Sequence, residues 1–338
     1  MDVRAVGENG GGQDNFICLQ TMWRSCGTYI FNKFRQDESV HSYFEPCSEF
    51  LVAKSADAIR QELSDATQAG LRHTGASRQS FAAFPFAESG GVQGFMKRFA
   101  FENYYLKRDE EDPELQRYLT CLIAYAREHG KTPVAKCCRF GLRADWLDRV
   151  LSPISIYVVR NPDAMFRSYW SFGGRRSYFL VASLLIVSKN RHLELFRELA
   201  DELRIPPIAD APLRREFAAA REASLRLDHQ DFRDLVLFLW AITLAQNWCV
   251  AGVLVDVDLL AYSDPYRRSV ADQLYTQTGR RLSLHDAELR QTPDAPGRLL
   301  SQRGASCAVN AMRRLLRGQT LPPLELSAQS ASVLSALV

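Results

Sequence analysis

Two turns that carry an arginine hold the side chains best suited to chemistry in this sequence. The first, Arg24–Thr28, follows the short apolar run 16–19, and a helical pattern of apolar residues resumes directly after it. A strand, a turn of small residues and a helix N-terminus form an anion site, because the first-turn N–H groups lack intrahelical partners and the helix dipole is positive there. Arg24 adds a planar charge, and Ser25 and Thr28 add hydroxyl donors. The turn predicts a phosphate or sulfate site, with an ordinary strand–turn–helix junction as the alternative.

The second turn, Arg160–Pro162, ends the β-branched run 154–159. An arginine at a strand end offers a fork of donors to a phosphate dianion. Ser168 follows eight residues later, about two turns into the next helix, where its hydroxyl can approach the same group. For this pair alone, a surface arginine and an ordinary helical serine are the alternative.

Short apolar strands that alternate with helices must position these turns. The strand candidates are 16–19, 132–138, 154–159 and 253–257. Strands that are apolar on both faces predict an α/β fold with a mostly parallel central sheet flanked by helices. Ligands of such sheets bind at the carboxyl ends of the strands. Four candidate sites fall at those ends: 24–28, 136–139, 160–168 and 256–258.

The chain of 338 residues reads as one large domain. We expect a flexible lead over 1–14, a single domain over 15–320, and a loosely ordered tail over 321–338 because that stretch lacks periodicity. Within the domain, 177–248 is predicted to be helical and to lie on the acceptor side, and 55–68 has apolar residues at helical spacing. Pro46 predicts an extended backbone at the preceding residue.

Composition excludes several classes of function. A net charge of +3 is too small to argue for nucleic acid. Eight cysteines and six histidines show no metal-ligand spacing, and the cysteines are typical of reduced thiols in the cytoplasm. No run reaches the roughly 18 apolar residues of a membrane span. Arg175-Arg176 and the basic stretch 313–317 are interpreted as solvent-exposed surface. Attraction of an anionic acceptor or of a membrane surface is the alternative.

The run Met22–Tyr29 resembles the phosphosulfate loop of sulfotransferases that use 3′-phosphoadenosine-5′-phosphosulfate (PAPS), above all those that act on carbohydrates. Cys26 stands where that family usually has glycine, and Gly27 follows it. The strand 154–159 with Arg160 and Ser168 is similar to the family's 3′-phosphate motif. The resemblance implies a P-loop-like sulfotransferase fold with a helical insertion, and a nucleotide donor without a metal. The residues that it implies for donor binding are Arg24, Ser25, Cys26, Gly27, Thr28, Tyr29, Arg160 and Ser168.

The segment Phe44-Glu45-Pro46 is similar to an aromatic-Glu-Pro segment of the carbohydrate sulfotransferases. Sulfuryl transfer needs a base for the acceptor hydroxyl, and the resemblance implies Glu45 in that role, with Arg24 neutralising charge on the leaving phosphate. His41 and Glu49 are the alternative bases. A salt-bridged or helix-capping carboxylate is the alternative role for Glu45.

Three further segments resemble elements of the same family. Lys136–Arg139 is similar to its Lys-x-x-Arg, which meets either the sulfuryl group or an acidic acceptor, with a solvated basic turn as the alternative. The stretch 255–265 is similar to a later strand of the family, and Arg303-Gly304 to an element at the 3′-phosphate.

Taken together, these matches imply a sulfotransferase that moves the sulfuryl group from PAPS to an acceptor hydroxyl on a carbohydrate or glycolipid and leaves adenosine 3′,5′-bisphosphate. An ATP-dependent, P-loop-like kinase is one alternative, although G-x-x-x-x-G-K-[ST] is absent. A non-catalytic nucleotide-binding protein of the same fold is the other.

Overall fold

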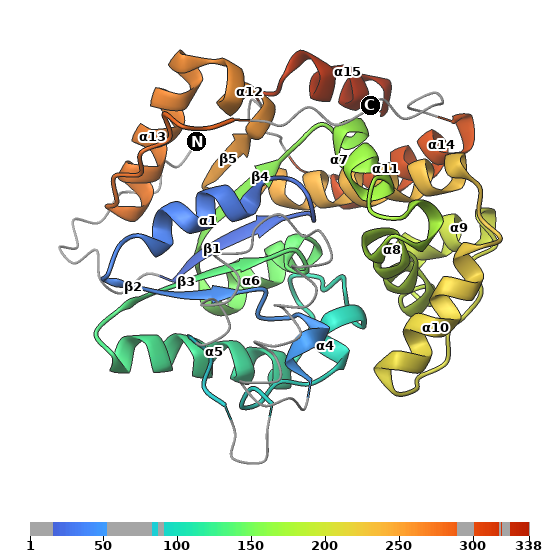
Figure 1. Cartoon of the computed structure of the whole chain (residues 1–338), viewed down its shortest axis with the longest axis horizontal. Helices are drawn as coiled ribbons and strands as arrows, with labels where there is room; N and C mark the ends of the chain where they lie inside the picture. The colour runs from blue at the N-terminus through green and yellow to red at the C-terminus, as the bar shows by residue number, and fades with distance from the viewer. Residues whose placement is uncertain are drawn as a thin grey trace.

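A five-stranded parallel sheet forms the centre of the computed structural model, which describes residues 16–52, 83–86, 91–288, 301–317, 319 and 325–337. The strands are β1 (Ile17–Thr21), β2 (Val40–Phe44), β3 (Thr132–Cys137), β4 (Ile154–Val159) and β5 (Val253–Asp256). Their order in the sheet is β2-β3-β1-β4-β5 (Figure 1). The predicted α/β fold with a parallel sheet flanked by helices is confirmed. The predicted lead over 1–14 and helix over 55–68 lie outside the described residues.

Helices cover both faces of this sheet. They are α1 (Gly27–Arg35), α4 (Arg98–Phe101), α5 (Pro113–Glu128), α6 (Ala144–Leu151), α7 (Pro162–Trp170), α8 (Tyr178–Lys189), α9 (Glu194–Glu202), α10 (Leu213–Ser224), α11 (His229–Trp248), α12 (Val257–Tyr262), α13 (Asp264–Thr278), α14 (Gln302–Leu315) and α15 (Ala328–Leu337). On β4, Ile156 and Val158 pack on the α1 and α13 side, whereas Tyr157 and Val159 pack toward α7 and α11. This alternation buries both faces of the strand, as expected for a parallel sheet.

Local capping explains where three of the helices begin. The Asp112 carboxylate accepts from the backbone N–H of Leu115 at the start of α5, and Asn161 Oδ1 accepts from Asp163 and Ala164 at the start of α7. Proline follows each cap, at the position where its missing N–H is harmless. Asp228 forms a reciprocal capping box at the start of α11. Each such cap stabilises its helix by about 1 kcal/mol.

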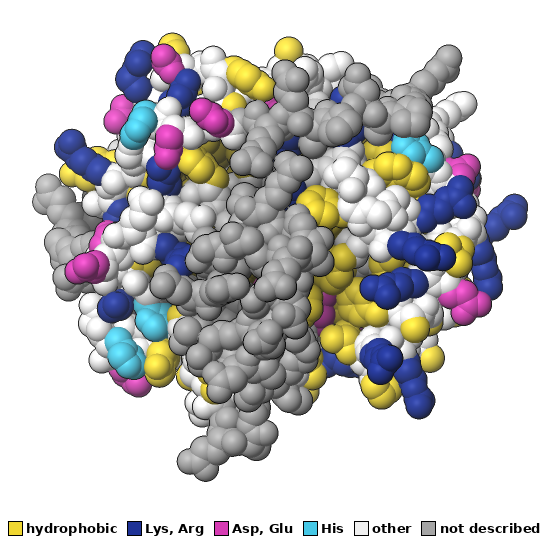
Figure 2. All heavy atoms as spheres, viewed as in Figure 1, with side chains coloured by type: hydrophobic (Ala, Val, Ile, Leu, Met, Phe, Trp, Pro, Cys, Tyr) yellow, Lys and Arg dark blue, Asp and Glu magenta, His cyan; other side chains and the backbone are white. Residues whose placement is uncertain are grey.

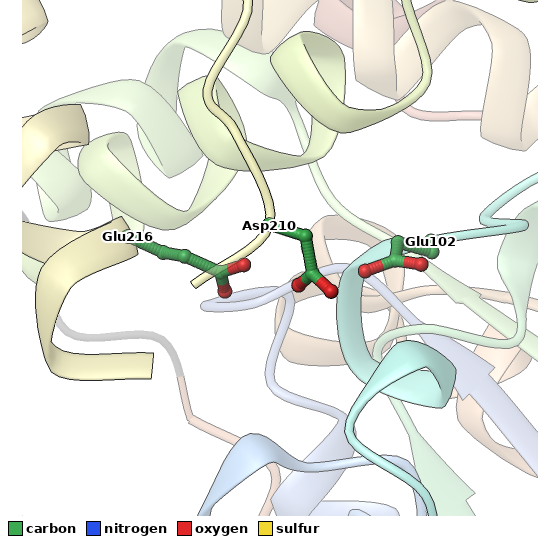
Figure 3. Close-up of side chains that lie close together, drawn as sticks. All are labelled: Glu102, Asp210 and Glu216. Carbon is green, nitrogen blue, oxygen red and sulfur yellow. The ribbon is translucent and has the colours of Figure 1, made fainter. Parts of the chain in front are cut away.

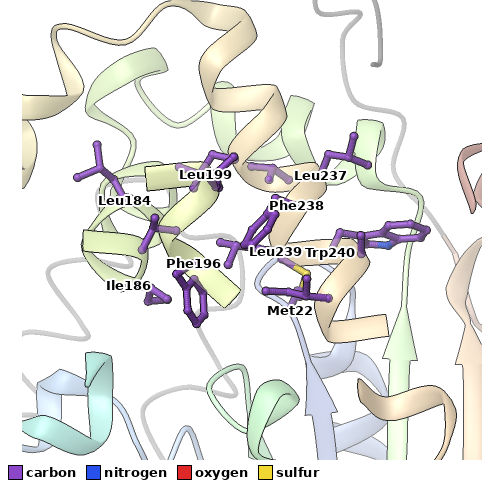
Figure 4. Packing of buried hydrophobic residues seen from close by; sticks show 14 of the residues in the cluster. Met22, Leu184, Ile186, Phe196, Leu199, Leu237, Phe238, Leu239 and Trp240 are labelled. Atoms are coloured by element: carbon purple, nitrogen blue, oxygen red, sulfur yellow. The ribbon is translucent and has the colours of Figure 1, made fainter. Parts of the chain in front are cut away.

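The helical region between β4 and β5 has its own hydrophobic core, which extends to Met22 and Trp23 in the turn after β1. Figure 4 shows Met22 beside side chains of α11, with those of α8 and α9 to the left. The predicted helical stretch 177–203 divides into α8 and α9, because Asn190 turns its amide to the carbonyl of Phe101, at 2.6 Å, and ends α8. This side of the molecule carries a group of Lys and Arg side chains beside hydrophobic ones (Figure 2).

The C-terminal tail differs from its prediction. Residues 328–337 form α15 instead of an irregular tail, and Val333 and Leu337 are each 2% exposed. The helix start is attached to the sheet, because the backbone N–H of Ser327 donates to Asp256 Oδ2 at 3.0 Å. None of the helices in the described part of the chain is both long and apolar enough to cross a membrane.

Candidate functional site

The carboxyl ends of the five strands meet at one edge of the sheet, because all the strands are parallel. Both β1 and β4 deliver their arginine turns to this edge as neighbouring strands. The turn after β5 joins them, since the backbone N–H of Asn161 donates to Asp258 Oδ2 at 2.8 Å. The four segments predicted to carry sites thus all lie at the edge where ligands of such sheets bind.

The turn between β1 and α1 has an unusual backbone. Arg24 and Cys26 have φ angles of 62° and 61°, in the left-handed region. Cys26 is the N-cap of α1, and within the described part of the chain no side chain caps this helix end. A Cβ on Gly27 would overlap the methyl group of Thr21, so only glycine fits there. The backbone N–H groups of this turn and of the first helical turn therefore form a concave donor surface suited to an anion.

A cavity of about 220 Å³ opens beside this turn. Its lining consists of Met22, Arg24, Cys26, Gly27, Thr28, Tyr29, Lys136, Arg160, Val257, Leu260, Ala261, Ala287 and Glu288. Three cationic side chains, Arg24, Lys136 and Arg160, face one carboxylate, the exposed Glu288 at the rim. This charge balance favours an anionic ligand.

The two arginine turns are joined by direct hydrogen bonds. Arg24 Nε donates to Ser168 Oγ at 2.8 Å, and Arg160 Nη1 donates to the carbonyl of Arg24 at 3.0 Å. Ser168 lies behind Arg24 and does not line the cavity. The hydroxyl of Ser25 is also turned inward, because it donates to the carbonyl of Met22 at 2.6 Å. Of the eight residues expected to bind a donor, six line the cavity. The other two, Ser25 and Ser168, form hydrogen bonds with lining residues Met22 and Arg24.

Arg160 has the clearest unused binding capacity in the cavity. It is 7% exposed, and its buried Nε has no hydrogen-bond partner among the residues that the structure describes. A buried donor without a partner is unfavourable by about 1–3 kcal/mol, so it points to a ligand that completes the site. A phosphate oxygen fits this donor.

The helical region holds both turns from behind. The indole Nε1 of Trp240 on α11 donates to the carbonyl of Arg160 at 2.9 Å. The hydroxyl of Tyr169 donates to the carbonyl of Trp23 at 2.8 Å. The guanidinium of Arg24 lies 4.7 Å from the ring centroid of Phe172, which fixes its plane.

Glu45 lies at the end of β2 in a ring of donors. Its carboxylate forms an ion pair with Lys136, accepts the backbone N–H of Cys138 at 2.9 Å and the thiol of Cys138 at 3.0 Å, and lies 3.6 Å from Arg139 Nη1. Burial alone raises the pKa of this carboxyl, but Lys136 and Arg139 outweigh it and hold the pKa below its ordinary value. Glu45 is therefore ionised at neutral pH, and its two cationic neighbours make it a weaker base than a free carboxylate.

The backbone at Glu45 is not extended, contrary to the prediction from Pro46. Its φ is 50°, in the left-handed region. The turn is held by a hydrogen bond from the backbone N–H of Glu45 to the carbonyl of Lys136 at 2.7 Å, and it aims the carboxylate at the end of β3. Tertiary hydrogen bonds thus override the local preference before proline.

The two alternative bases are placed less favourably than Glu45. His41 is the second residue of β2, so it lies toward the opposite edge of the sheet, where its Nε2 contacts the carbonyl of Ala83 at 2.8 Å. Glu49 is buried, and its two carboxylate oxygens bond to Arg139 and to the hydroxyl of Tyr178. Glu49 therefore has a structural role, because neither Arg139 nor Tyr178 lines the cavity, whereas the Lys136 partner of Glu45 does.

Of the remaining motif-like segments, Arg303-Gly304 does not reach the cavity, whereas 255–265 contributes Val257, Leu260 and Ala261 to its lining. Arg303 forms an ion pair with Asp231 and lies 3.5 Å from Asp234, both on α11. Asp256 caps α12 by accepting the N–H of Asp258 at 2.8 Å. These residues stabilise the fold around the site.

A cluster of carboxylates lies apart from the cavity, between α10 and the segment after α4. Glu102, Asp210 and Glu216 bring oxygen atoms within 4.8 Å of one another (Figure 3). Lys97 pairs with Asp210 and Glu216, and Lys189 Nζ lies 2.6 Å from Glu216 Oε1. Because two ammonium groups already neutralise most of this charge, we interpret the cluster as an ionic contact between elements and not as a metal centre.

Sequence reasoning placed only part of the apolar wall of the cavity in a candidate site. Val257 lies in the predicted site 256–258 at the end of β5, whereas Leu260 and Ala261 follow on α12 and were not singled out as site residues. Ala287 and Glu288 follow α13 in an irregular segment, and no local pattern marks them.

Comparison of the chain with models of known protein families, with curated proteins and with solved structures gave no match. The functional argument therefore depends on the geometry of the site and on the motifs themselves.

Proposed function

We propose that this protein is a sulfotransferase that moves the sulfuryl group of PAPS to an acceptor hydroxyl. The observation that carries the proposal is the junction of three parts around one cavity. These parts are the uncapped turn at α1, the Arg160 guanidinium with its unpartnered Nε, and Lys136, which lines the cavity and pairs with Glu45 behind the lining. An anion-binding loop, a second phosphate ligand and a carboxylate base are the parts that such a transfer requires.

In this proposal the two ends of the donor bind to different parts of the cavity. The 5′-phosphosulfate lies against the N–H groups of Cys26, Gly27 and Thr28, where the dipole of α1 adds positive potential. Arg160 receives the 3′-phosphate, and Ser168 orients Arg24 between the two groups. The apolar wall from α12 faces the nucleoside.

The transfer itself balances as a single in-line displacement. The acceptor oxygen forms a bond to sulfur while the bond from sulfur to the bridging phosphate oxygen breaks. The acceptor proton passes to Glu45, and the electron pair of the broken bond stays on adenosine 3′,5′-bisphosphate. Arg24 and Lys136 neutralise the charge that develops on this leaving group.

A hydroxyl of a carbohydrate or glycolipid is the acceptor that we favour. The support is the likeness of Met22–Tyr29 and Phe44-Glu45-Pro46 to segments of carbohydrate sulfotransferases. The Lys and Arg side chains over the helical region in Figure 2 suit an acceptor that carries negative charge.

The direct experiment is transfer of labelled sulfuryl from PAPS to a panel of glycans, glycolipids and tyrosine peptides. We expect Glu45→Ala to lower the transfer rate by about 10²–10⁴-fold while nucleotide binding remains. The matched control is Glu128→Gln, which removes an exposed carboxylate at the end of α5 and should leave the rate unchanged. Full activity of Glu45→Ala would reassign the base.

Arg24→Ala tests the loop in the same assay. Because Arg24 is proposed to contact both donor and leaving group, its loss should weaken donor binding and slow transfer together. An unchanged rate at saturating PAPS would show that the loop does not stabilise the leaving group.

A further inference from the structure

Lys136 belongs to two parts of the site at once. Its side chain lines the cavity, yet its ammonium forms an ion pair with Glu45, which lies behind the cavity lining. The same Nζ lies 3.2 Å from Cys138 Sγ. We propose, on the basis of the sulfotransferase function above, that Lys136 blocks Glu45 until the phosphosulfate of the donor draws the lysine into the cavity.

The two cations beside Glu45 differ in their freedom to move. Arg139 is 1% exposed, its Nε donates to the carbonyl of Ala100 at 3.0 Å, and its guanidinium pairs with Glu49. Its guanidinium carbon also lies 5.1 Å from the ring centroid of Trp23. Arg139 is thus fixed on all sides. Lys136 carries a compact charge on a flexible stem, and its ammonium has one carboxylate partner among the described residues.

Movement of Lys136 leaves Glu45 in position. The carboxylate keeps the backbone N–H of Cys138 at 2.9 Å, the thiol of Cys138 at 3.0 Å and Arg139 at 3.6 Å. The thiols of Cys137 on β3 and of Cys47 after β2 also lie close enough to interact electrostatically with Glu45. Loss of the nearest positive charge makes Glu45 a stronger base, because an adjacent cation stabilises the ionised form.

The consequence is an order of events at the site. Without a donor, Lys136 neutralises Glu45, and an acceptor hydroxyl meets a paired carboxylate. When the phosphosulfate binds beside Arg24 and Arg160, it offers Lys136 a stronger anionic partner. The same movement then places a cation at the leaving group and exposes the base, so that the acceptor is deprotonated only when a donor is present.

A double-mutant cycle on nucleotide binding tests this arrangement. The probe is adenosine 3′,5′-bisphosphate, and its affinity is measured by calorimetry for the wild type, Glu45→Gln, Lys136→Met and the double variant. Glu45→Gln releases Lys136 and should bind the probe about tenfold more tightly, whereas Lys136→Met should bind about tenfold more weakly. In the Lys136→Met background, Glu45→Gln should change the affinity by less than about twofold.

The possible outcomes separate this inference from the function on which it depends. If the wild type does not bind the probe, the sulfotransferase proposal fails and the inference fails with it. If the wild type binds but Glu45→Gln gives no gain, Lys136 stays on Glu45 and the inference alone is overturned. An equal gain in affinity from Glu45→Gln with and without Lys136 would also overturn it. The gain would then come from removing a negative charge near the nucleotide and not from releasing Lys136. Lys136→Gln replaces Lys136→Met if the latter does not fold.

A pH profile gives the readout that a purely structural lysine would not affect. At saturating PAPS, the acid limb of the transfer rate reports the pKa of Glu45 with the donor bound. Because Lys136 has by then left Glu45, we expect the same apparent pKa in wild type and Lys136→Met. A clearly higher pKa in Lys136→Met would mean that the pair persists and would overturn the inference.

Discussion

Cys26 occupies a backbone conformation that L residues rarely adopt, with φ 61° and ψ 14°. A side chain in this left-handed region is unfavourable by about 1–2 kcal/mol, and most of all when it is branched at Cβ. Burial also raises the pKa of its thiol, although Arg160 and Arg24 oppose the shift, so the side chain is neutral at pH 7. Cys26 therefore contributes to the site through the conformation of its backbone and not through a reactive thiolate.

A pair of substitutions at this residue tests the conformational argument. Cys26→Gly accepts the positive φ without strain, whereas Cys26→Val adds a branched side chain there. We expect the valine variant to be less stable than the glycine variant by at least about 1 kcal/mol in urea unfolding. Equal stability of the two would show that the turn relaxes to another conformation.

Glu45 gives the protein a predictable dependence of stability on pH. Its folded-state pKa lies below the ordinary value of 4.5, because Lys136 and Arg139 outweigh the effect of burial. The unfolded chain therefore binds the proton more readily, and the stabilisation is present above pH 4.5 and is lost as the pH falls through the folded-state pKa.

The measurement compares urea unfolding of wild type and Glu45→Gln across this range. At pH 7 the variant leaves Lys136 buried without its partner and should be less stable by about 3 kcal/mol. This difference should shrink as the pH falls well below the ordinary value of 4.5. A difference that stays constant with pH would mean that the pair does not control the carboxyl.

At the scale of elements, the close approach of β1 and α1 shapes the anion-binding turn. Gly27 begins α1 directly against Thr21, the last residue of β1. Gly27→Ala should lower the free energy of unfolding by about 2 kcal/mol, because its methyl group overlaps that of Thr21. In a Thr21→Ser background, where the opposing methyl is absent, the loss should be less than half as large. The same loss in both backgrounds would place the conflict elsewhere.

The ionic contact between α10 and the segment after α4 has a different test. Glu216 is 1% exposed and pairs with Lys97 and Lys189. Glu216→Gln should cost about 2 kcal/mol of stability, since it leaves buried ammonium groups underpaired. Added calcium or a chelator should not change the melting temperature of the wild type, because those ammonium groups occupy the carboxylates. A clear stabilisation by calcium would instead establish a metal site.

At the scale of the whole molecule, local pattern predicted four of the five strands and the edge of the sheet where the candidate sites lie, but not β2 (Val40–Phe44). Strands β1, β3 and β4 are short, buried and rich in apolar residues, and a parallel sheet places every carboxyl end on one side. The two arginine turns were thus predicted to lie at the same edge, and they meet because β1 and β4 are neighbours in the sheet. The position of the second turn is also visible in the sequence, because Asn161 and Pro162 start α7 immediately after β4.

Contacts between distant segments were beyond such reasoning. Lys136 and Glu45 are 91 residues apart and pair only because β3 lies beside β2 in the sheet. The helix over 328–337 was missed for a similar reason, since Val333 and Leu337 are buried against elements far away in the chain. The left-handed backbone at Glu45 likewise depends on its bond to Lys136. Local spacing does not encode these pairings.

The binding of adenosine 3′,5′-bisphosphate and adenosine 5′-monophosphate, compared by calorimetry in wild type and Arg160→Ala, tests the central claim most directly. The two ligands differ only in the 3′-phosphate that Arg160 is proposed to receive. We predict that the wild type prefers the bisphosphate by at least about tenfold, and that Arg160→Ala loses most of this preference. Equal binding of the two nucleotides by the wild type, or tighter binding of ATP than of the bisphosphate, would contradict a PAPS site.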